Sequence, residues 1–411
     1  MAHFLERLQN TSVFEPVPDD LVARITGRNS SLFAQDLQDH KDQITKIIEA
    51  ARILIIGAAG SIGSATVKYI ASLKPSALVL VDINENELAD LVRFLRSGDF
   101  PLPGDFATSV AAMGSPGFER LFEAFGPFDL AMNFAALKHV RSERDPFSVM
   151  RMLETNVLAT DQLIALARNK GTRVFSVSSD KAVYPGNLMG ASKRWMERLL
   201  RTPGVNATSA RFANVAFSRG SLLSAFCDRL AMRQPMAAPN DVERYFISHR
   251  EAAELCLLGA VCCKVGEVIM PKLDPSSDRI KLDDAAAQFL GFCGLRPEYC
   301  TSAEEAKQSP YLLQDEPAAW PCFFSASNTA GEKPAEEFRY PFEQHDDKRF
   351  RRATAAVIEE PDWSNLAEAR ERVKAVAASR AWIKNELEKA IKCAVPELQH
   401  VENALSLDAK L

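Results

Sequence analysis

The sequence predicts an α/β protein in which helices cover both faces of a doubly wound parallel sheet. Short, continuous apolar runs, among them RILIIG at 52–57 and ALVLVD at 77–82, alternate with segments of helical length. Such runs are typical of strands buried on both faces, and strand–helix alternation implies parallel connections. A glycine-rich turn directly after the first run is the third observation, because ligands of such sheets bind at the carboxyl ends of the strands.

Each element follows from a local pattern. Residues 1–50 are polar and place Ile44, Ile47 and Ile48 at helical spacing, so this stretch is expected to be helical. Strands are expected at 52–57, 77–82, 128–136 and 173–179, and helices at 64–73, 87–95 and 150–168. The alternation of strands and helices becomes irregular from about residue 216, and residues 296–361 are rich in Pro, Ser and Glu. Apolar residues recur at helical spacing from 364 to 395, so this segment is expected to be helical.

The composition argues against several classes of protein. The net charge of the 411 residues is −5 and no dense basic block is present, so no nucleic-acid partner is expected. No apolar run approaches the roughly 20 residues that span a bilayer, and the first residues lack a secretory apolar core. We therefore expect a cytoplasmic protein without a membrane span. The eight cysteines and six histidines are dispersed without metal-ligand spacing, so no metal is expected.

The turn GAAGSIG at 57–63 has the spacing of a dinucleotide-binding fingerprint. Gly57, Gly60 and Gly63 allow a tight turn, and they let the backbone approach a pyrophosphate at the N-terminus of the following helix. Ser61 and Ile62 complete the turn and are expected to contact the cofactor as well.

The acidic residue that this fingerprint requires is present. Asp82 closes the next strand 19 residues after Gly63, where its carboxylate can hold the hydroxyls of the adenosine ribose. Together with Glu85 and Glu87 it would repel a 2′-phosphate, so NAD is expected and NADP is less favoured.

Two further segments complete the expected cofactor site. Ala135 and Ala136 follow Asn133 at a strand end, where small side chains let the nicotinamide half lie across the sheet. Asn156 is expected to brace that strand from the next helix. The prediction is thus a Rossmann-type NAD-binding domain at 51–215 with a smaller C-terminal substrate-binding lobe at 216–361, partly interleaved with it. Helical extensions at 1–50 and 362–411 flank these two parts.

The segment SSDKAVYPGNLMGASKR at 178–194 resembles the active-site segment of short-chain dehydrogenases, with one substitution. Those enzymes carry a catalytic Tyr four residues before a Lys, whereas this chain has Met189 before Lys193. Together with NFAALKHVRSERDP at 133–146, RFANVAFSRGS at 211–221 and RYF at 244–246, the segment resembles the NDP-sugar 4,6-dehydratases that act on UDP-N-acetylglucosamine. Many members of that family of extended short-chain dehydrogenases have Met at the Tyr position.

The resemblance implies a hydro-lyase that uses bound NAD and serves surface-polysaccharide or glycan synthesis. Separately, a homo-oligomer is expected. Asp180 would act as the acid for the leaving hydroxyl and Lys181 as the base at C5. Ser179 would replace the usual Thr, and Lys193 would hold the nicotinamide ribose. How O4 loses its proton stays open between Asp180 and a water molecule in the space that the Tyr leaves.

The nucleotide-sugar substrate would meet residues from three segments. Lys138 and His139 would face it, and Asn214, Arg219 and Arg244 would contact its diphosphate, for which the planar fork of Arg is well suited. The family's GLRPGEK..EE loop is split into 294–297 and 331–337 here, which leaves the roles of Lys333 and Glu336 open.

Two alternatives belong to other classes of function. The first is a 4-epimerase or 4-ketosugar reductase on the same scaffold, although epimerases generally keep the Tyr as base. The second is a catalytically silent NAD-binding regulator, against which Asp180, Lys181 and Lys193 argue. Tyr184 could in principle replace the missing Tyr, but Pro185 follows it and it lies outside the helix face that carries Lys193.

Overall fold

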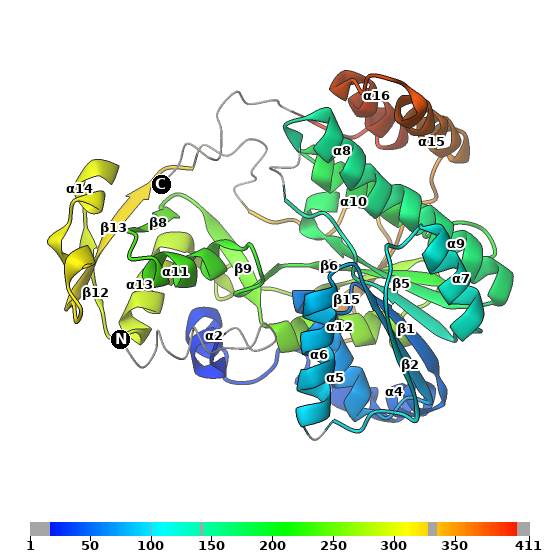
Figure 1. The fold of residues 1–411 in the computed structure, drawn as a ribbon, viewed down its shortest axis with the longest axis horizontal. Helices are drawn as coiled ribbons and strands as arrows, with labels where there is room; N and C mark the ends of the chain where they lie inside the picture. The colour runs from blue at the N-terminus through cyan, green and yellow to red at the C-terminus, as the bar shows by residue number, and fades with distance from the viewer. Residues whose placement is uncertain (1–16, 99, 140–142, 328–334, 401–411) are drawn as a thin grey trace.

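A nine-stranded mixed sheet forms the centre of the larger lobe (Figure 1). The computed structural model describes residues 17–98, 100–139, 143–327 and 335–400. The strand order is β14-β15-β10-β6-β5-β4-β1-β2-β3. The seven strands from β10 to β3 are parallel, and β15 runs antiparallel to both β10 and β14. Their bounds are β1 Arg52–Ile56, β2 Ala77–Asp82, β3 Asp105–Val110, β4 Leu130–Asn133, β5 Arg173–Ser179, β6 Ala207–Phe212, β10 Glu267–Pro271, β14 His345–Asp346 and β15 Ala353–Val357.

Helices cover both faces of this sheet, as the apolar runs require. One face packs against α4 (Lys41–Ala50), α5 (Ser61–Ser72), α6 (Glu85–Ser97) and α12 (His249–Cys262). The other packs against α7 (Pro116–Phe125), α8 (Pro146–Leu153), α9 (Ala159–Lys170) and α10 (Leu188–Leu199). Strand β1 shows the alternation, since Ile53 and Ile55 join the first core whereas Leu54 and Ile56 join the second. The predicted fold class is confirmed.

The smaller lobe is built on two three-stranded sheets. One has the order β11-β9-β7 (Arg279–Lys281, Glu243–Ile247, Asn214–Val215) and the other β12-β13-β8 (Arg296–Tyr299, Ala319–Ser325, Met236–Pro239). Helices α11 (Leu222–Ala231) and α13 (Leu282–Phe292) share its apolar core with α2 (Asp19–Thr26) from the N-terminal extension. The short helix α14 (Ala303–Lys307) contacts β13 in this lobe, whereas α3 (Ala34–Asp39) packs against the core of the larger lobe. Residues 216–361 therefore contribute to both lobes, because β10, β14 and β15 lie in the large sheet.

The C-terminal helices pack on the larger lobe beside the helix that carries Lys193. Helices α15 (Trp363–Ala378) and α16 (Lys384–Ala394) form a hairpin that contacts α10 and α8 (Figure 1). Leu387 and Ile391 are fully buried in the core that α10 shares. The sequence did not decide whether this tail packs on the core of the same chain or on another subunit. In the structure it packs on the core of the same chain.

Candidate functional site

The glycine-rich turn lies where the order of the sheet changes direction, between β1 and β4. The order β3-β2-β1-β4-β5-β6 leaves a crevice at the carboxyl ends of β1 and β4, the place where open α/β sheets bind ligands. Gly57 has a φ of +73°, and a Cβ there would come within 2.7 Å of the Ala135 nitrogen. A Cβ on Gly63 would lie 2.1 Å from the Gly57 carbonyl oxygen. Both positions therefore need glycine.

A cavity of about 490 Å³ opens directly beside this turn. Its wall has small or apolar side chains from the ends of β1, β3 and β4, and it includes Gly57, Gly60, Asp82, Ile83, Ala111, Met113, Ala135 and Ala136. Ile83 is 65% exposed at its rim. A planar base and a ribose suit a largely apolar wall with the Asp82 carboxylate at its end, so the residues present fit the adenosine half of a dinucleotide.

Asp82 is fixed by the backbone of the turn itself. One carboxylate oxygen accepts from the Ala59 N–H at 2.9 Å and the other from the Asn84 N–H at 3.0 Å. Each oxygen keeps a lone pair that can accept a ribose hydroxyl. Glu87 lines the same cavity but is paired with Arg219, so repulsion of a 2′-phosphate rests mainly on Asp82.

Arg219 reaches across the glycine turn from the smaller lobe. Its guanidinium donates to the Ala59 carbonyl oxygen at 2.6 Å and pairs with Glu87, and its backbone N–H donates to Ser61 Oγ at 3.1 Å. Lys138 donates to the Arg219 carbonyl oxygen at 2.9 Å. Burial and then the Arg219 cation lower the pKa of Lys138. Lys138 and Arg219 therefore lie together at the glycine-rich turn, called the cofactor turn below.

His139 lies against the same loop. A Cβ on Gly220 would lie 2.7 Å from the His139 imidazole. The structure thus brings Lys138, His139 and Arg219 together, whereas Asn214 and Arg244, which were also expected to bind the diphosphate, contact Glu336.

Asn156 ties the loop after β4 to helix α10. It lies in a π-helical turn, Glu154–Leu158, which interrupts the helix expected at 150–168. Its side chain accepts from the Leu137 N–H and donates to the Leu137 carbonyl oxygen, both at 2.9 Å, and it also donates to Ser192 Oγ at 2.9 Å. Ala135 and Ala136, which precede Leu137, are thereby held in place at the cavity wall.

Ser179, Asp180 and Lys181 form a compact turn at the carboxyl end of β5. Ser179 Oγ donates to Asp180 at 2.7 Å and accepts from the Lys181 N–H at 3.2 Å. Lys181 Nζ lies 3.3 Å from the Asp180 carboxylate. The side chain of Asp180 is 10% exposed and that of Lys181 is 37% exposed. An acid and an amine are therefore in direct contact at the mouth of the crevice.

Met189 and Lys193 occupy the buried face of α10. Met189 is 2% exposed, and its N–H donates to the Glu143 carboxylate at 2.9 Å. Lys193 Nζ donates to the Val177 carbonyl oxygen at 3.0 Å, two residues before Ser179. Burial lowers the pKa of Lys193 from 10.5 to about 8, although the nearby Glu197 carboxylate raises it.

Asn214 and Arg244 gather around a carboxyl group whose role the sequence left open. Glu336 accepts a short hydrogen bond from the Asn214 amide and another from the Tyr245 N–H at 3.2 Å, and the Arg244 guanidinium lies 3.8 Å away. Burial first, and then the Asp180 carboxylate, raise the pKa of Glu336 to about 7. Lys333 lies outside the described residues.

Two residues near the site were not recognised from the sequence. Tyr340 and Glu343 lie after the GEKPAEE block at 331–337, and no sequence signal marked them, whereas that block did contain Glu336. In the described part of the chain, no three His, Cys, Asp or Glu side chains cluster as metal ligands would. Over the same residues, no helix has the length and apolar character needed to cross a bilayer.

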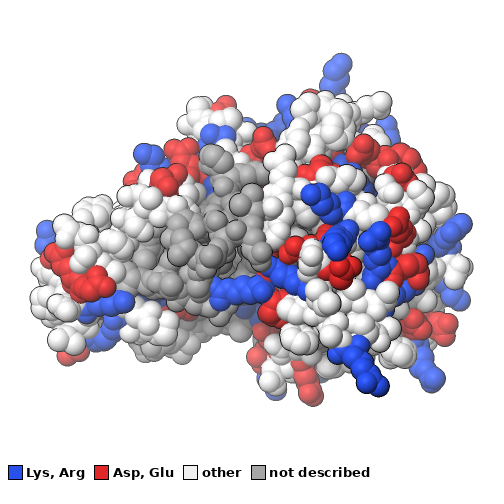
Figure 2. All heavy atoms as spheres, turned by 90° about the horizontal axis from the view of Figure 1, so that it is seen from above, with Lys and Arg blue, Asp and Glu red and all other residues white. Residues whose placement is uncertain are grey.

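Acidic and basic side chains are interspersed on the face of the larger lobe that Figure 2 shows. Neither sign of charge forms a continuous stripe there.

The fold resembles those of solved nucleotide-sugar enzymes and related proteins. Pen from Bacillus thuringiensis matches with a TM-score of 0.61 at 22% identity, over 75% of this chain and 88% of that chain. The UDP-glucuronic acid 4-epimerase from Bacillus cereus, solved with UDP-glucuronic acid and NAD, matches with a TM-score of 0.50 at 15% identity, over 70% and 90% of the two chains. At these identities the likeness concerns the fold.

Curated relatives are similar in sequence as well. The uncharacterized membrane protein MJ1061 of Methanocaldococcus jannaschii is 33% identical over 62% of this chain and 76% of its own length. The probable polysaccharide biosynthesis protein EpsC of Bacillus subtilis and the capsular polysaccharide biosynthesis protein CapD of Staphylococcus aureus are each 28% identical, over 72% and 62% of this chain. The matches span 49% of EpsC and 45% of CapD, so the chain covers about half the length of those two relatives. A family model described as "Polysaccharide biosynthesis protein" matches residues 53–308, more than half of the chain, and the protein therefore belongs to the polysaccharide biosynthesis protein family.

Proposed function

We propose that the protein is an NAD-dependent NDP-sugar 4,6-dehydratase that converts UDP-N-acetylglucosamine to a UDP-4-keto-6-deoxy-N-acetylhexosamine. The observation that carries the proposal is the contact between Asp180 and Lys181 at the carboxyl end of β5, one strand away from the cofactor cavity. Met189 has no proton to exchange, so the acid–base chemistry must come from groups such as these two. The family membership and the NAD and nucleotide sugar in the Bacillus cereus structure support the class of enzyme.

The residues of the site divide the proposed reaction among them. Bound NAD supplies the oxidation at C4 and the return of the hydride at C6. Lys181, in its neutral form, removes the proton from C5, while Asp180 protonates the hydroxyl that leaves C6. Ser179 orients the Asp180 carboxyl through its 2.7 Å hydrogen bond. Lys193 holds the nicotinamide ribose, and the apolar Met189 side chain keeps the position of the usual Tyr free of a competing acid.

The cations at the cofactor turn and the polar cluster around Glu336 are the proposed ligands of the dinucleotide and of the substrate. Arg219 lies close enough to the glycine turn to contact a pyrophosphate there. Asn214 and Arg244 contact Glu336, whose carboxyl interacts electrostatically with Asp180 and Lys181, and we assign them to the substrate diphosphate near the reacting sugar.

The product formed in deuterated water tests the proposal. A dehydratase should yield a sugar lighter by one water, with a ketone at C4 and one deuterium at C5, because the proton removed from C5 is replaced from solvent. Mass spectrometry and NMR of purified protein with UDP-N-acetylglucosamine would show both. Asp180→Asn and Lys181→Met should each lower turnover by about 10²–10⁴-fold, whereas Tyr184→Phe should cost less than about tenfold. An inactive Tyr184→Phe variant together with an active Lys181→Met variant would overturn the assignment of the acid and base to Asp180 and Lys181.

A 4-epimerase is the second candidate, because a solved enzyme of similar fold is one. An epimerase would return a sugar of unchanged mass with no deuterium on carbon. That result with UDP-N-acetylglucosamine would replace the dehydratase proposal.

A further inference from the structure

The turn that carries Asp180 and Lys181 is held by a side chain far downstream in the sequence. Tyr340 Oη accepts from the Tyr184 N–H at 2.8 Å and donates to the Ala182 carbonyl oxygen at 3.1 Å. These two backbone groups lie one and three residues after Lys181. One phenol therefore closes the end of the 3₁₀ turn Asp180–Ala182.

This turn needs an external restraint. Tyr184 has a φ of +44°, in the left-handed region that favours glycine. Pro185 follows and restricts the conformations open to Tyr184. The Tyr340 ring packs edge-on against the Tyr184 ring at a centroid distance of 4.6 Å, and so contacts the strained residue through its ring as well as through its hydroxyl.

Tyr340 is itself locked in place. It is 1% exposed, stacks on Phe342 at 4.9 Å, and lies 4.6 Å from the Arg194 guanidinium. Burial raises the pKa of its phenol well above the ordinary value, so the hydroxyl keeps the proton that it donates. Its backbone N–H donates to Glu343 at 3.0 Å.

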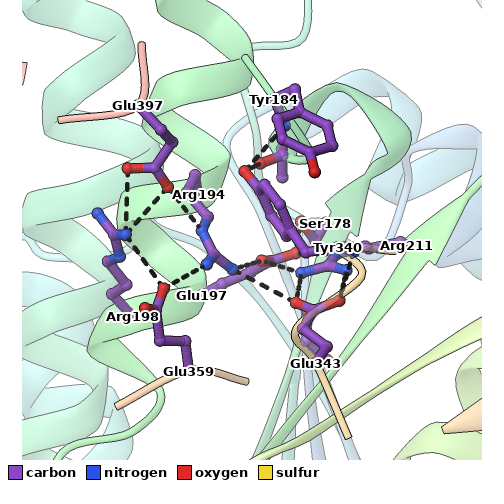
Figure 3. A network of polar contacts seen from close by, with 12 residues as sticks. Ser178, Tyr184, Arg194, Glu197, Arg198, Arg211, Tyr340, Glu343, Glu359 and Glu397 are labelled. Atoms are coloured by element: carbon purple, nitrogen blue, oxygen red, sulfur yellow. Dashed lines mark hydrogen bonds and ion pairs between the residues drawn. The ribbon is translucent and has the colours of Figure 1, made fainter. Parts of the chain in front are cut away.

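A network of buried ion pairs fixes the segment that carries Tyr340 and Glu343 to helix α10 and strand β6 (Figure 3). Arg211 of β6 lies 2.8 Å from Glu197 and 2.7 Å from Glu343, and Arg194 lies 3.2 Å and 3.6 Å from the same two carboxylates. All four side chains are 0% exposed, and their formal charges cancel. Glu197 also accepts from Ser178 Oγ at 2.6 Å, one residue before Ser179.

The network therefore joins the Tyr340–Glu343 segment to two elements of the site. Arg194 and Glu197 belong to α10, the helix that carries Lys193, and Ser178 belongs to β5, the strand that ends at Asp180. Glu397 and Glu359, from the C-terminal part of the chain, extend it through ion pairs to Arg194 at 3.1 Å and 3.0 Å.

We propose that Tyr340 is a positioning residue, whose hydroxyl holds the Asp180–Lys181 turn in its working conformation. The ion network places the phenol relative to α10 and β5. The role of Tyr340 in turnover rests on the proposed function of Asp180 and Lys181, whereas its hold on the turn does not.

The test is Tyr340→Phe, which keeps the ring and removes both hydrogen bonds to the turn. Amide hydrogen exchange at Tyr184 should accelerate by about tenfold or more, because the N–H loses its buried acceptor. With UDP-N-acetylglucosamine, kcat should fall by about 10- to 100-fold while KM changes less than about threefold. Tyr299→Phe removes a hydroxyl from an exposed position in the smaller lobe and should change neither quantity.

Each outcome decides the proposal. Unchanged exchange at Tyr184 would refute it, and so would faster exchange with an unchanged kcat. If the wild-type protein forms no 4-keto product, the dehydratase function fails alone, and the exchange comparison still decides whether Tyr340 holds the turn. If Tyr340→Phe does not fold, exchange in the wild-type protein decides, since an unprotected Tyr184 amide would contradict the hydrogen bond.

Discussion

Replacing Lys193 by Met should change how the stability of the protein depends on pH. Burial lowers the pKa of Lys193 from 10.5 to about 8, so between these values the folded state holds fewer protons than the unfolded state. Folding is therefore favoured as the pH rises through this window, and the cost of burying the cation is complete below about pH 8. From the two pKa values, that cost falls from about 3 kcal/mol at pH 7 to about 1 kcal/mol at pH 10. The free energy of unfolding of the wild type, measured relative to Lys193→Met, should rise by about 2 kcal/mol over that range.

Urea unfolding followed by circular dichroism at several pH values measures this difference. Lys193→Met lacks the hydrogen bond to Val177 at every pH. This loss shifts the variant's curve of unfolding free energy against pH without changing its slope. Lys170→Met removes an exposed lysine from α9 and serves as the control, for which no slope is expected. Parallel curves for wild type and Lys193→Met would show that the ammonium is solvated, which would refute the assignment of Lys193 to a buried site.

Four other outcomes are expected. Gly63→Ala should abolish NAD binding, measured by calorimetry, because its Cβ would lie 2.1 Å from a backbone oxygen of the turn. Asp82→Ala should weaken NAD binding, and a wild-type protein that binds NADP equally well would contradict the role given to this carboxylate. Glu343→Gln should lower the free energy of unfolding by about 3–5 kcal/mol, because it leaves a buried guanidinium charge uncompensated; a loss below about 1 kcal/mol in urea unfolding would count against the network. Burial and then nearby cations lower the pKa of His249 to about 4, so the protein should lose up to about 3 kcal/mol of stability relative to His249→Gln as the pH falls from 6.5 to 4; equal losses in both proteins would contradict this.

The sequence was sufficient for features that depend on near neighbours in the chain. The strand at 77–82 and the strand at 173–179 have the predicted bounds, because their apolar runs are continuous and end sharply. The glycine turn was predictable for the same reason, since a Cβ on Gly63 would meet the Gly57 carbonyl oxygen six residues earlier. The helix expected at 150–168 was less accurate, because a π-helical turn around Asn156 serves a contact with Leu137 that local propensity does not encode.

Residues whose environment depends on chain segments far apart needed the tertiary structure. Arg219 was expected at the substrate diphosphate, and only the tertiary structure shows that its guanidinium also reaches the carbonyl oxygen of Ala59, 160 residues earlier. The GEKPAEE block suggested a role for Glu336, but only the tertiary structure shows that Asn214 and Tyr245 are its neighbours.

By itself the sequence determined the fold class, the glycine turn, the place of Asp180 and Lys181 at a strand end and that of Lys193 on a helix, because each depends on short-range sterics, apolar periodicity or strand ends. It did not predict β3, β6, β10, β14 and β15, which complete the sheet. Only the tertiary structure decided what surrounds Asp180, Lys181 and Lys193. Tyr340 lies 156 residues beyond Tyr184, and it reaches the turn because Arg194, Glu197, Arg211 and Glu343 compensate one another in a core that excludes water. A buried charge is tolerated only beside its partner, and that partner is chosen by the packing of the whole chain and not by any local pattern.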